Sequence, residues 1–73
     1  MPLLDNLYNT LTRKVQTANK DITREIVEDW VQDAGPADRQ IAFMTGALTA
    51  LYSGTYTPDK MVGDILHSDH LDN

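Results

Sequence analysis

The two histidines of the chain, His67 and His70, are the side chains best suited to metal chemistry. Their spacing places two side chains on one face of a helix, and Asp64 and Asp69 lie close to them in the sequence. Histidine and carboxylate ligands of this kind bind zinc or nickel. A structural zinc site, however, needs four ligands on a rigid support, and these histidines adjoin a polar segment. We therefore predict no metal site and no cofactor.

Serine and threonine hydroxyls are the main candidate nucleophiles, because the chain contains no cysteine. A catalytic hydroxyl needs a base that takes its proton and a third group that orients the base. Neither Ser53 nor Ser68 lies in a sequence that forms a strained nucleophile turn, and helix caps and turns account for both. The chain is therefore predicted not to be an enzyme.

Carboxylates crowd the segment 21–33. At about 100° per residue they cover the half of a helix opposite its apolar residues, so we expect them to be solvated and to titrate normally. The first interpretation is a solvated surface helix without a further role. Like charges without a compensating lysine cost a helix some stability, so a docking surface for a basic partner is the alternative. The candidate partner-binding acids are Asp21, Glu25, Glu28, Asp29 and Asp33.

Tyr56 is a further candidate for partner binding, because tryptophan and tyrosine are enriched at binding hot spots. It falls in a loop expected between two helices, where it would be partly exposed and would lie beside Tyr52 as an anchor. Trp30 lies on the apolar side of the acidic helix and is expected to fill the core.

The net charge of −5, from 11 acidic and 6 basic residues, bears on the kind of partner. Basic side chains drive non-specific nucleic-acid binding, so direct binding of DNA or RNA is not expected. The order helix, Gly35-Pro36 turn, helix suggests a helix-turn-helix, but the second helix offers the major groove only Arg39, beside Asp38. A helix-turn-helix regulator stays as one alternative. A nucleic-acid mimic, with carboxylates at phosphate-like spacing, is another.

Four helical segments and no strand are expected to position these residues. Apolar residues recur at steps of three and four, and Gly35-Pro36, Gly54 and Thr57-Pro58 supply end and start signals. A break near Asp21, with Asp21 as a helix cap, is favoured over one continuous helix to Ala34, which would leave three helices. The expected helices are residues 3–19, 22–34, 37–53 and 58–67.

These segments predict a single all-α domain, a compact bundle over residues 1–67, followed by a flexible polar tail over residues 68–73. A chain of 73 residues has room for one small core, and without cysteine it cannot use disulfides. The residues expected in the core are Leu7, Leu11, Val15, Ile26, Trp30, Ile41, Met44, Leu48, Leu51, Val62 and Ile65.

The helix over residues 37–53 is expected at the centre of the bundle. It carries no charge from Gln40 to Ser53, and opposite its bulky side it has a side of small residues, Ala42, Gly46 and Ala50. A helix that is apolar or small almost all round is usually buried, and small side chains let another backbone approach closely. This second packable side also suggests a homodimer.

Together these features predict a small, acidic, non-enzymatic module that binds a larger protein with a basic surface and occludes it. This profile is typical of accessory regulators and inhibitors that bacteriophages and other mobile elements encode. The start of the chain lacks a secretory signal, and no apolar run is long enough to cross a bilayer core of about 30 Å. We therefore expect a cytoplasmic protein that does not enter membranes. A small structural subunit of a larger assembly is the remaining alternative.

Overall fold

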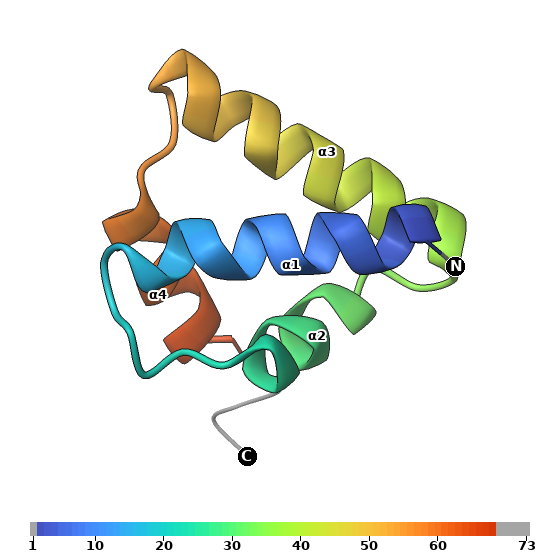
Figure 1. The fold of residues 1–73 in the computed structure, drawn as a ribbon, viewed down its shortest axis with the longest axis horizontal. Helices are drawn as coiled ribbons and strands as arrows, with labels where there is room; N and C mark the ends of the chain where they lie inside the picture. The colour runs from blue at the N-terminus through green and yellow to red at the C-terminus, as the bar shows by residue number, and fades with distance from the viewer. Residues whose placement is uncertain (1, 69–73) are drawn as a thin grey trace.

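The chain forms four helices in the computed structural model, which describes residues 2–68 (Figure 1). Helix α1 covers Pro2–Gln16, α2 covers Arg24–Gln32, α3 covers Ala37–Ser53 and α4 covers Pro58–Leu66. The predicted all-α bundle of four short helices is therefore confirmed, with α1 and α2 separate. No helix among the described residues is long and apolar enough to cross a membrane. Most of the predicted tail, residues 69–73, lies outside the described residues.

Side chains bonded to the backbone hold the segment between α1 and α2. Asn19 Oδ1 accepts a hydrogen bond from the backbone N–H of Asp21 at 3.0 Å, and Gln16 Nε2 donates to the carbonyl of Ile22 at 2.9 Å. Thr23 caps α2, because its Oγ1 accepts from the backbone N–H three residues further on at 3.3 Å. The prediction of Asp21 as the cap is wrong, because Ile22 turns into the core before the helix begins.

The bounds of α3 and the start of α4 follow signals that are visible in the sequence, whereas α1 and α2 end at residues 16 and 32, before the predicted ends at residues 19 and 34. Gly35 and Gly54 have positive φ angles of 112° and 81°, a conformation that glycine adopts without steric cost. Pro36 precedes the first residue of α3, and Thr57 caps α4 by accepting from the backbone N–H of Lys60 at 3.2 Å. The predicted bounds of α3 therefore agree with the structure, and α4 ends one residue earlier than predicted.

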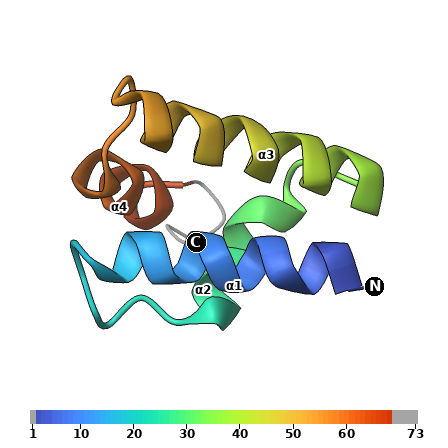
Figure 2. The ribbon, with the colours of Figure 1, turned by 45° about the horizontal axis from the view of Figure 1, so that its top comes forward.

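Helix α1, and not α3, is the centre of the fold. It packs against each of the other three helices, whereas α3 makes little contact with α4 (Figures 1 and 2). Tyr8, Leu11 and Val15 of α1 are buried. In α3 only Met44 and Leu48 are buried, so the prediction that α3 is enclosed on all sides is wrong. One side of α3 packs on α1, and on the other side, within residues 2–68, Ala42 and Gly46 are exposed.

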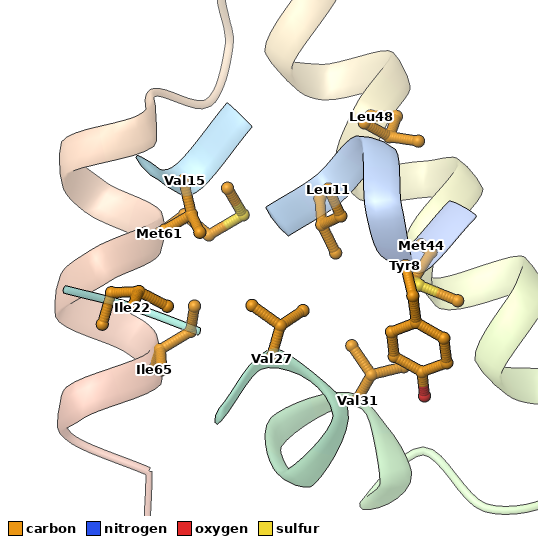
Figure 3. Close-up of a cluster of buried hydrophobic side chains, with 10 residues drawn as sticks. All are labelled: Tyr8, Leu11, Val15, Ile22, Val27, Val31, Met44, Leu48, Met61 and Ile65. Atoms are coloured by element: carbon orange, nitrogen blue, oxygen red, sulfur yellow. The ribbon is translucent and has the colours of Figure 1, made fainter. Parts of the chain in front are cut away.

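Within residues 2–68, ten buried apolar side chains form the core, and they come from all four helices and the loop after α1 (Figure 3). The predicted core is confirmed for Leu11, Val15, Met44, Leu48 and Ile65. Five more of the predicted residues are only partly buried and pack against its edge: Leu7, Ile26, Trp30, Leu51 and Val62. Ile41 is half-buried and lies outside it. The core is completed by five residues outside the expected list, which are Tyr8, Ile22, Val27, Val31 and Met61.

Helix α2 turns a different edge toward the core than its sequence predicts. Val27 and Val31 are fully buried, whereas Ile26 and Trp30 are half-buried. On one side of the two valines, Arg24 binds α1, and on the other side Trp30 meets a ring of α3. The apolar residues of α2 cover half of the cylinder, so several rotations would bury an apolar edge. The contacts on its two sides select one of them.

A short chain of hydrogen bonds fixes α1 to the turn between α2 and α3. The Tyr8 hydroxyl donates to Gln40 Oε1 at 2.6 Å, and Gln40 Nε2 donates to the carbonyl of Gly35 at 2.8 Å. Burial raises the pKa of the Tyr8 phenol, so the phenol stays a neutral donor. These bonds hold the start of α3 in place relative to the end of α2.

Candidate functional site

The structure brings together part of the predicted acidic surface. Glu25 is exposed and Asp29 is half-buried on α2, and Asp33 is exposed directly after its last residue. Asp21 is also exposed, but it lies in the loop before α2 rather than on the helix. We refer to Glu25, Asp29 and Asp33 as the acidic face.

Glu28, the remaining predicted acid, is engaged inside the molecule. Arg24 Nε donates to Glu28 Oε2 at 2.5 Å, one helical turn away. The terminal nitrogens of Arg24 donate to Asn9 Oδ1 at 2.9 Å and to Asp5 Oδ1 at 2.6 Å. The same guanidinium lies over the Tyr8 ring, 5.5 Å from its centre. The expectation of full solvation is therefore wrong for Glu28, which is half-buried where α2 meets α1.

The contact with Arg24 also changes the titration of the α1 carboxylate. The hydrogen bond from Arg24, reinforced by its charge, lowers the pKa of Asp5, and the bonds to Asp5 and Glu28 raise the pKa of Arg24. These side chains are accessible to solvent, which screens their attraction. The main consequence is positional, because Arg24 fixes α2 against α1.

Tyr56 is half-buried, and its hydroxyl is bonded within the molecule. It donates to Asp64 Oδ2 on α4 at 2.5 Å. Burial, followed by this bond, raises the pKa of Tyr56 well above its ordinary value of 10.0. Asp64, considered from the sequence as a metal ligand, thus fixes the tyrosine ring beside α4.

An open and largely apolar hollow of about 470 Å³ lies between α2, α3 and α4. The rings of Trp30 on α2 and Phe43 on α3 meet edge to face, with their centres 5.0 Å apart and their planes at 77°. Tyr56 lines it from the loop before α4, and Asp64 lines it from α4 itself. We call it the aromatic hollow, and its lining residues are Trp30, Ala42, Phe43, Gly46, Ala47, Tyr56 and Asp64.

The aromatic hollow lies on the side of α3 that the sequence analysis expected to be buried. Ala42 and Gly46 are exposed, and Phe43 is 39% exposed. A Cβ atom added at Gly46 would meet nothing within 4 Å. Phe43 is a lining residue that was not among the candidate site residues. The signal that the sequence offers is the lack of charge from residue 40 to residue 53, which predicts burial and not an exposed site.

Tyr52 does not lie beside Tyr56 as the sequence analysis expected. It is 75% exposed, and Lys14 Nζ lies over its ring, 4.9 Å from the centre. This contact places Tyr52 on the α1 side of α3, whereas Tyr56 lines the aromatic hollow. The two tyrosines therefore belong to different surfaces.

Among the residues that the structure describes, those considered from the sequence as metal ligands or nucleophiles do not line the aromatic hollow, apart from Asp64. His67 is exposed at the end of α4, and Asp69 and His70 lie outside the described residues. Within residues 2–68, no group of three or more histidine, aspartate or glutamate side chains could hold a metal ion. The Ser53 hydroxyl donates to the carbonyl of Ala50 at 3.1 Å, at the end of α3.

The acidic face and the aromatic hollow are adjacent surfaces. Trp30 and Asp33 are three residues apart, a spacing that places side chains on neighbouring positions of a helix. A partner that covers the hollow therefore passes close to the acidic face. No protein-family model, curated protein sequence or solved structure matches the chain. Function has to be inferred from the chemistry of these two surfaces.

Proposed function

We propose that the protein is a non-enzymatic binding module that docks on a larger protein with a basic surface. The observation that carries the proposal is the aromatic hollow. It leaves Trp30 and Phe43, two large aromatic side chains, accessible on the surface of a 73-residue chain. Aromatic side chains in such positions supply most of the binding energy at many protein interfaces.

The charge of the chain indicates the kind of partner. Six basic residues stand against eleven acidic ones, and one of the six, Arg24, already binds Asp5 and Glu28. The acidic face beside the hollow would attract a basic surface over a distance comparable to the Debye length, about 8 Å at physiological salt. Such complementarity mainly speeds association and selects the partner.

The proposed mechanism is occlusion, in which the small chain covers a basic surface that its partner uses for another purpose. This is the action of an accessory regulator or inhibitor of the kind that bacteriophages encode, working in the cytoplasm. Asp21 and Tyr56 are retained as members of the proposed surface. Glu28 is assigned instead to the contact with Arg24, where it positions α2.

Affinity capture with the immobilised chain from lysate of the source cell, or of its host, tests this proposal. We expect a partner with a basic surface, and its retention should fall as salt rises from about 0.1 M to about 1 M, where the Debye length drops from about 10 Å to about 3 Å. The variant Glu25→Lys/Asp29→Lys should lose the partner. The variant Asp38→Lys/Asp59→Lys changes the net charge equally at exposed positions elsewhere and should keep it.

Retention that does not change with salt would contradict the proposal, and so would equal losses in the two double variants. Circular dichroism of each variant shows whether its helices remain. The binding of a variant that is still folded, whether kept or lost, then reports on the surface and not on folding.

A further inference from the structure

We infer that the aromatic hollow binds one amphipathic α-helix of the partner protein, which carries a lysine or arginine opposite Asp64. This inference rests on the proposed function, because it names the element of the basic partner that enters the hollow. The floor of the hollow, its aromatic wall and its charge each contribute to it.

The floor of the aromatic hollow suits the close approach of a helix. It is formed by Ala42, Gly46 and Ala47 of α3, and the space over Gly46 is open, because an added Cβ meets nothing within 4 Å. Packed helices lie 8–10 Å apart depending on the side chains at their contact. Small side chains therefore allow a second helix to lie close along α3.

The aromatic wall offers anchors that are already in place. Trp30 is half-buried and packs edge to face against Phe43, and the bonds from Tyr8 to Gln40 and from Gln40 to Gly35 tie together the helices that carry the two rings. Rigid aromatic anchors lose little conformational entropy on binding. Apolar residues spaced three and four apart on a partner helix could pack against both rings.

The charge at the hollow favours a basic helix over a second copy of this chain. Asp64 is an exposed carboxylate in the lining, held by the Tyr56 hydroxyl at 2.5 Å, and Asp33 lies at a neighbouring position beyond Trp30. A second copy would bring the same carboxylates and a further net charge of −5 to the contact. A lysine or arginine on the incoming helix pairs with Asp64 without such repulsion.

A helix also fits the hollow better than an extended peptide or a small polar ligand. An extended peptide binds by adding a strand to a sheet edge, and the elements described for residues 2–68 are all helices. Small-molecule sites present several convergent polar groups. The only side-chain polar groups in this lining are the indole N–H of Trp30, the Tyr56 hydroxyl and the Asp64 carboxylate, and the last two are bonded to each other.

The probe for this inference is a display library of random peptides of about 16 residues, long enough to form a helix on binding. The library is selected on the folded full chain. We expect the enriched peptides to combine apolar residues at helical spacing with lysine or arginine. On binding, they should shift the fluorescence of Trp30, which is the only tryptophan of the chain.

Two leucine variants of α3 provide matched controls. Gly46→Leu fills the hollow with its own side chain and should weaken the selected peptides by about tenfold or more, as the loss of a hot-spot contact does. Thr45→Leu adds the same side chain at an exposed position outside the lining and should leave binding unchanged. Asp64→Asn should weaken the basic peptides but not versions in which glutamine replaces their basic residues.

Three results would overturn the inference. They are the absence of any enriched peptide, enrichment of acidic or non-helical sequences, and unchanged binding to Gly46→Leu. Sedimentation of the chain alone gives a fourth: a dimer that Gly46→Leu abolishes would make a second copy the occupant of the hollow.

The same variants separate this inference from the proposed function. Suppose that the variant Glu25→Lys/Asp29→Lys no longer binds the captured partner but Gly46→Leu still does. The proposal of docking on a basic surface is then supported, and the binding of a helix in the hollow is refuted. Suppose instead that no basic partner is captured, that basic helical peptides still bind the chain, and that Gly46→Leu abolishes this binding. The inference about the hollow is then supported, and the proposed function is refuted.

Discussion

Replacing each glycine of the chain by alanine tests where the fold is open and where the backbone needs glycine. Gly46 and Gly63 lie inside α3 and α4, and a Cβ atom at either would meet nothing within 4 Å. Gly35 and Gly54 have φ angles of 112° and 81°. The structure therefore predicts that alanine raises the free energy of unfolding at Gly46 and Gly63 and lowers it at Gly35 and Gly54.

The magnitudes follow from the backbone at each position. Alanine in a helix interior is more favourable than glycine by about 1 kcal/mol, so Gly46→Ala should raise the free energy of unfolding by about that amount. Gly63→Ala should raise the free energy of unfolding by a smaller amount, about 0.5 kcal/mol, because α4 is short and the residue lies near its end. At positive φ an L side chain costs about 1–2 kcal/mol, so Gly35→Ala and Gly54→Ala should destabilise, and Gly35→Ala more strongly.

Urea unfolding, followed by circular dichroism and Trp30 fluorescence, measures these free energies, and thermal unfolding checks them. In a domain of this size, 1 kcal/mol corresponds to a shift in Tm of about 4–8 °C. Destabilisation by Gly46→Ala would refute the reasoning. It would mean that something already packs on the open side of α3.

Three further predictions concern polar groups. Thr12 is 7% exposed, and its Oγ1 has no hydrogen-bond partner, so Thr12→Val should stabilise the protein by about 1 kcal/mol in urea unfolding, whereas Thr12→Ser should not. The contact with Arg24 lowers the pKa of Asp5 in the folded protein below its ordinary value of 3.8. The stability that this contact supplies is therefore present above pH 3.8 and is lost as the pH falls through the pKa of the folded state. In acid unfolding, Asp5→Asn should lack this part of the loss of stability. Tyr56→Phe removes the bond to Asp64 and should cost about 1 kcal/mol, and the most alkaline part of the tyrosine absorbance titration should disappear with it.

The bounds of α3 and the start of α4 could be predicted because local chemistry determines them. Gly54 ends α3 in a conformation that favours glycine, and Thr57 caps α4 with its own side chain. The ends of α1 and α2 were predicted too late, at residues 19 and 34 instead of 16 and 32. The start of α2 was predicted two residues too early, because the packing of Ile22 into the core depends on the rest of the fold. Periodicity alone does not separate a buried loop residue from the first turn of a helix.

The rotation of α2 and the open side of α3 could not be predicted for a different reason. Periodicity shows which side chains are able to be buried, but it does not show which neighbours exist to cover them. The α3 side with Ala42 and Gly46 stays exposed, since α4 packs on α1 and leaves that side uncovered.

The candidate site was predictable only in part. The pairing of Arg24 with Glu28 has a local signal, their spacing of four in the sequence, but the contact of Arg24 with Asp5 joins residues 19 apart. Phe43 and Trp30 are separated by 13 positions and meet because of the turn at Gly35. The acids were recognised from composition, whereas the hollow beside them depends on the arrangement of three helices.

The central claim is that the uncharged outer side of α3, together with Trp30, is the binding surface of this protein. An NMR titration of the isotope-labelled chain with the partner helix tests it most directly, because each amide reports its own surroundings. The account predicts that the largest shifts are at the Trp30 indole N–H and at the amides of Phe43, Gly46 and Ala47. Shifts centred instead on Lys14 and Tyr52, on the other side of α3, with the Trp30 indole unchanged, would contradict it.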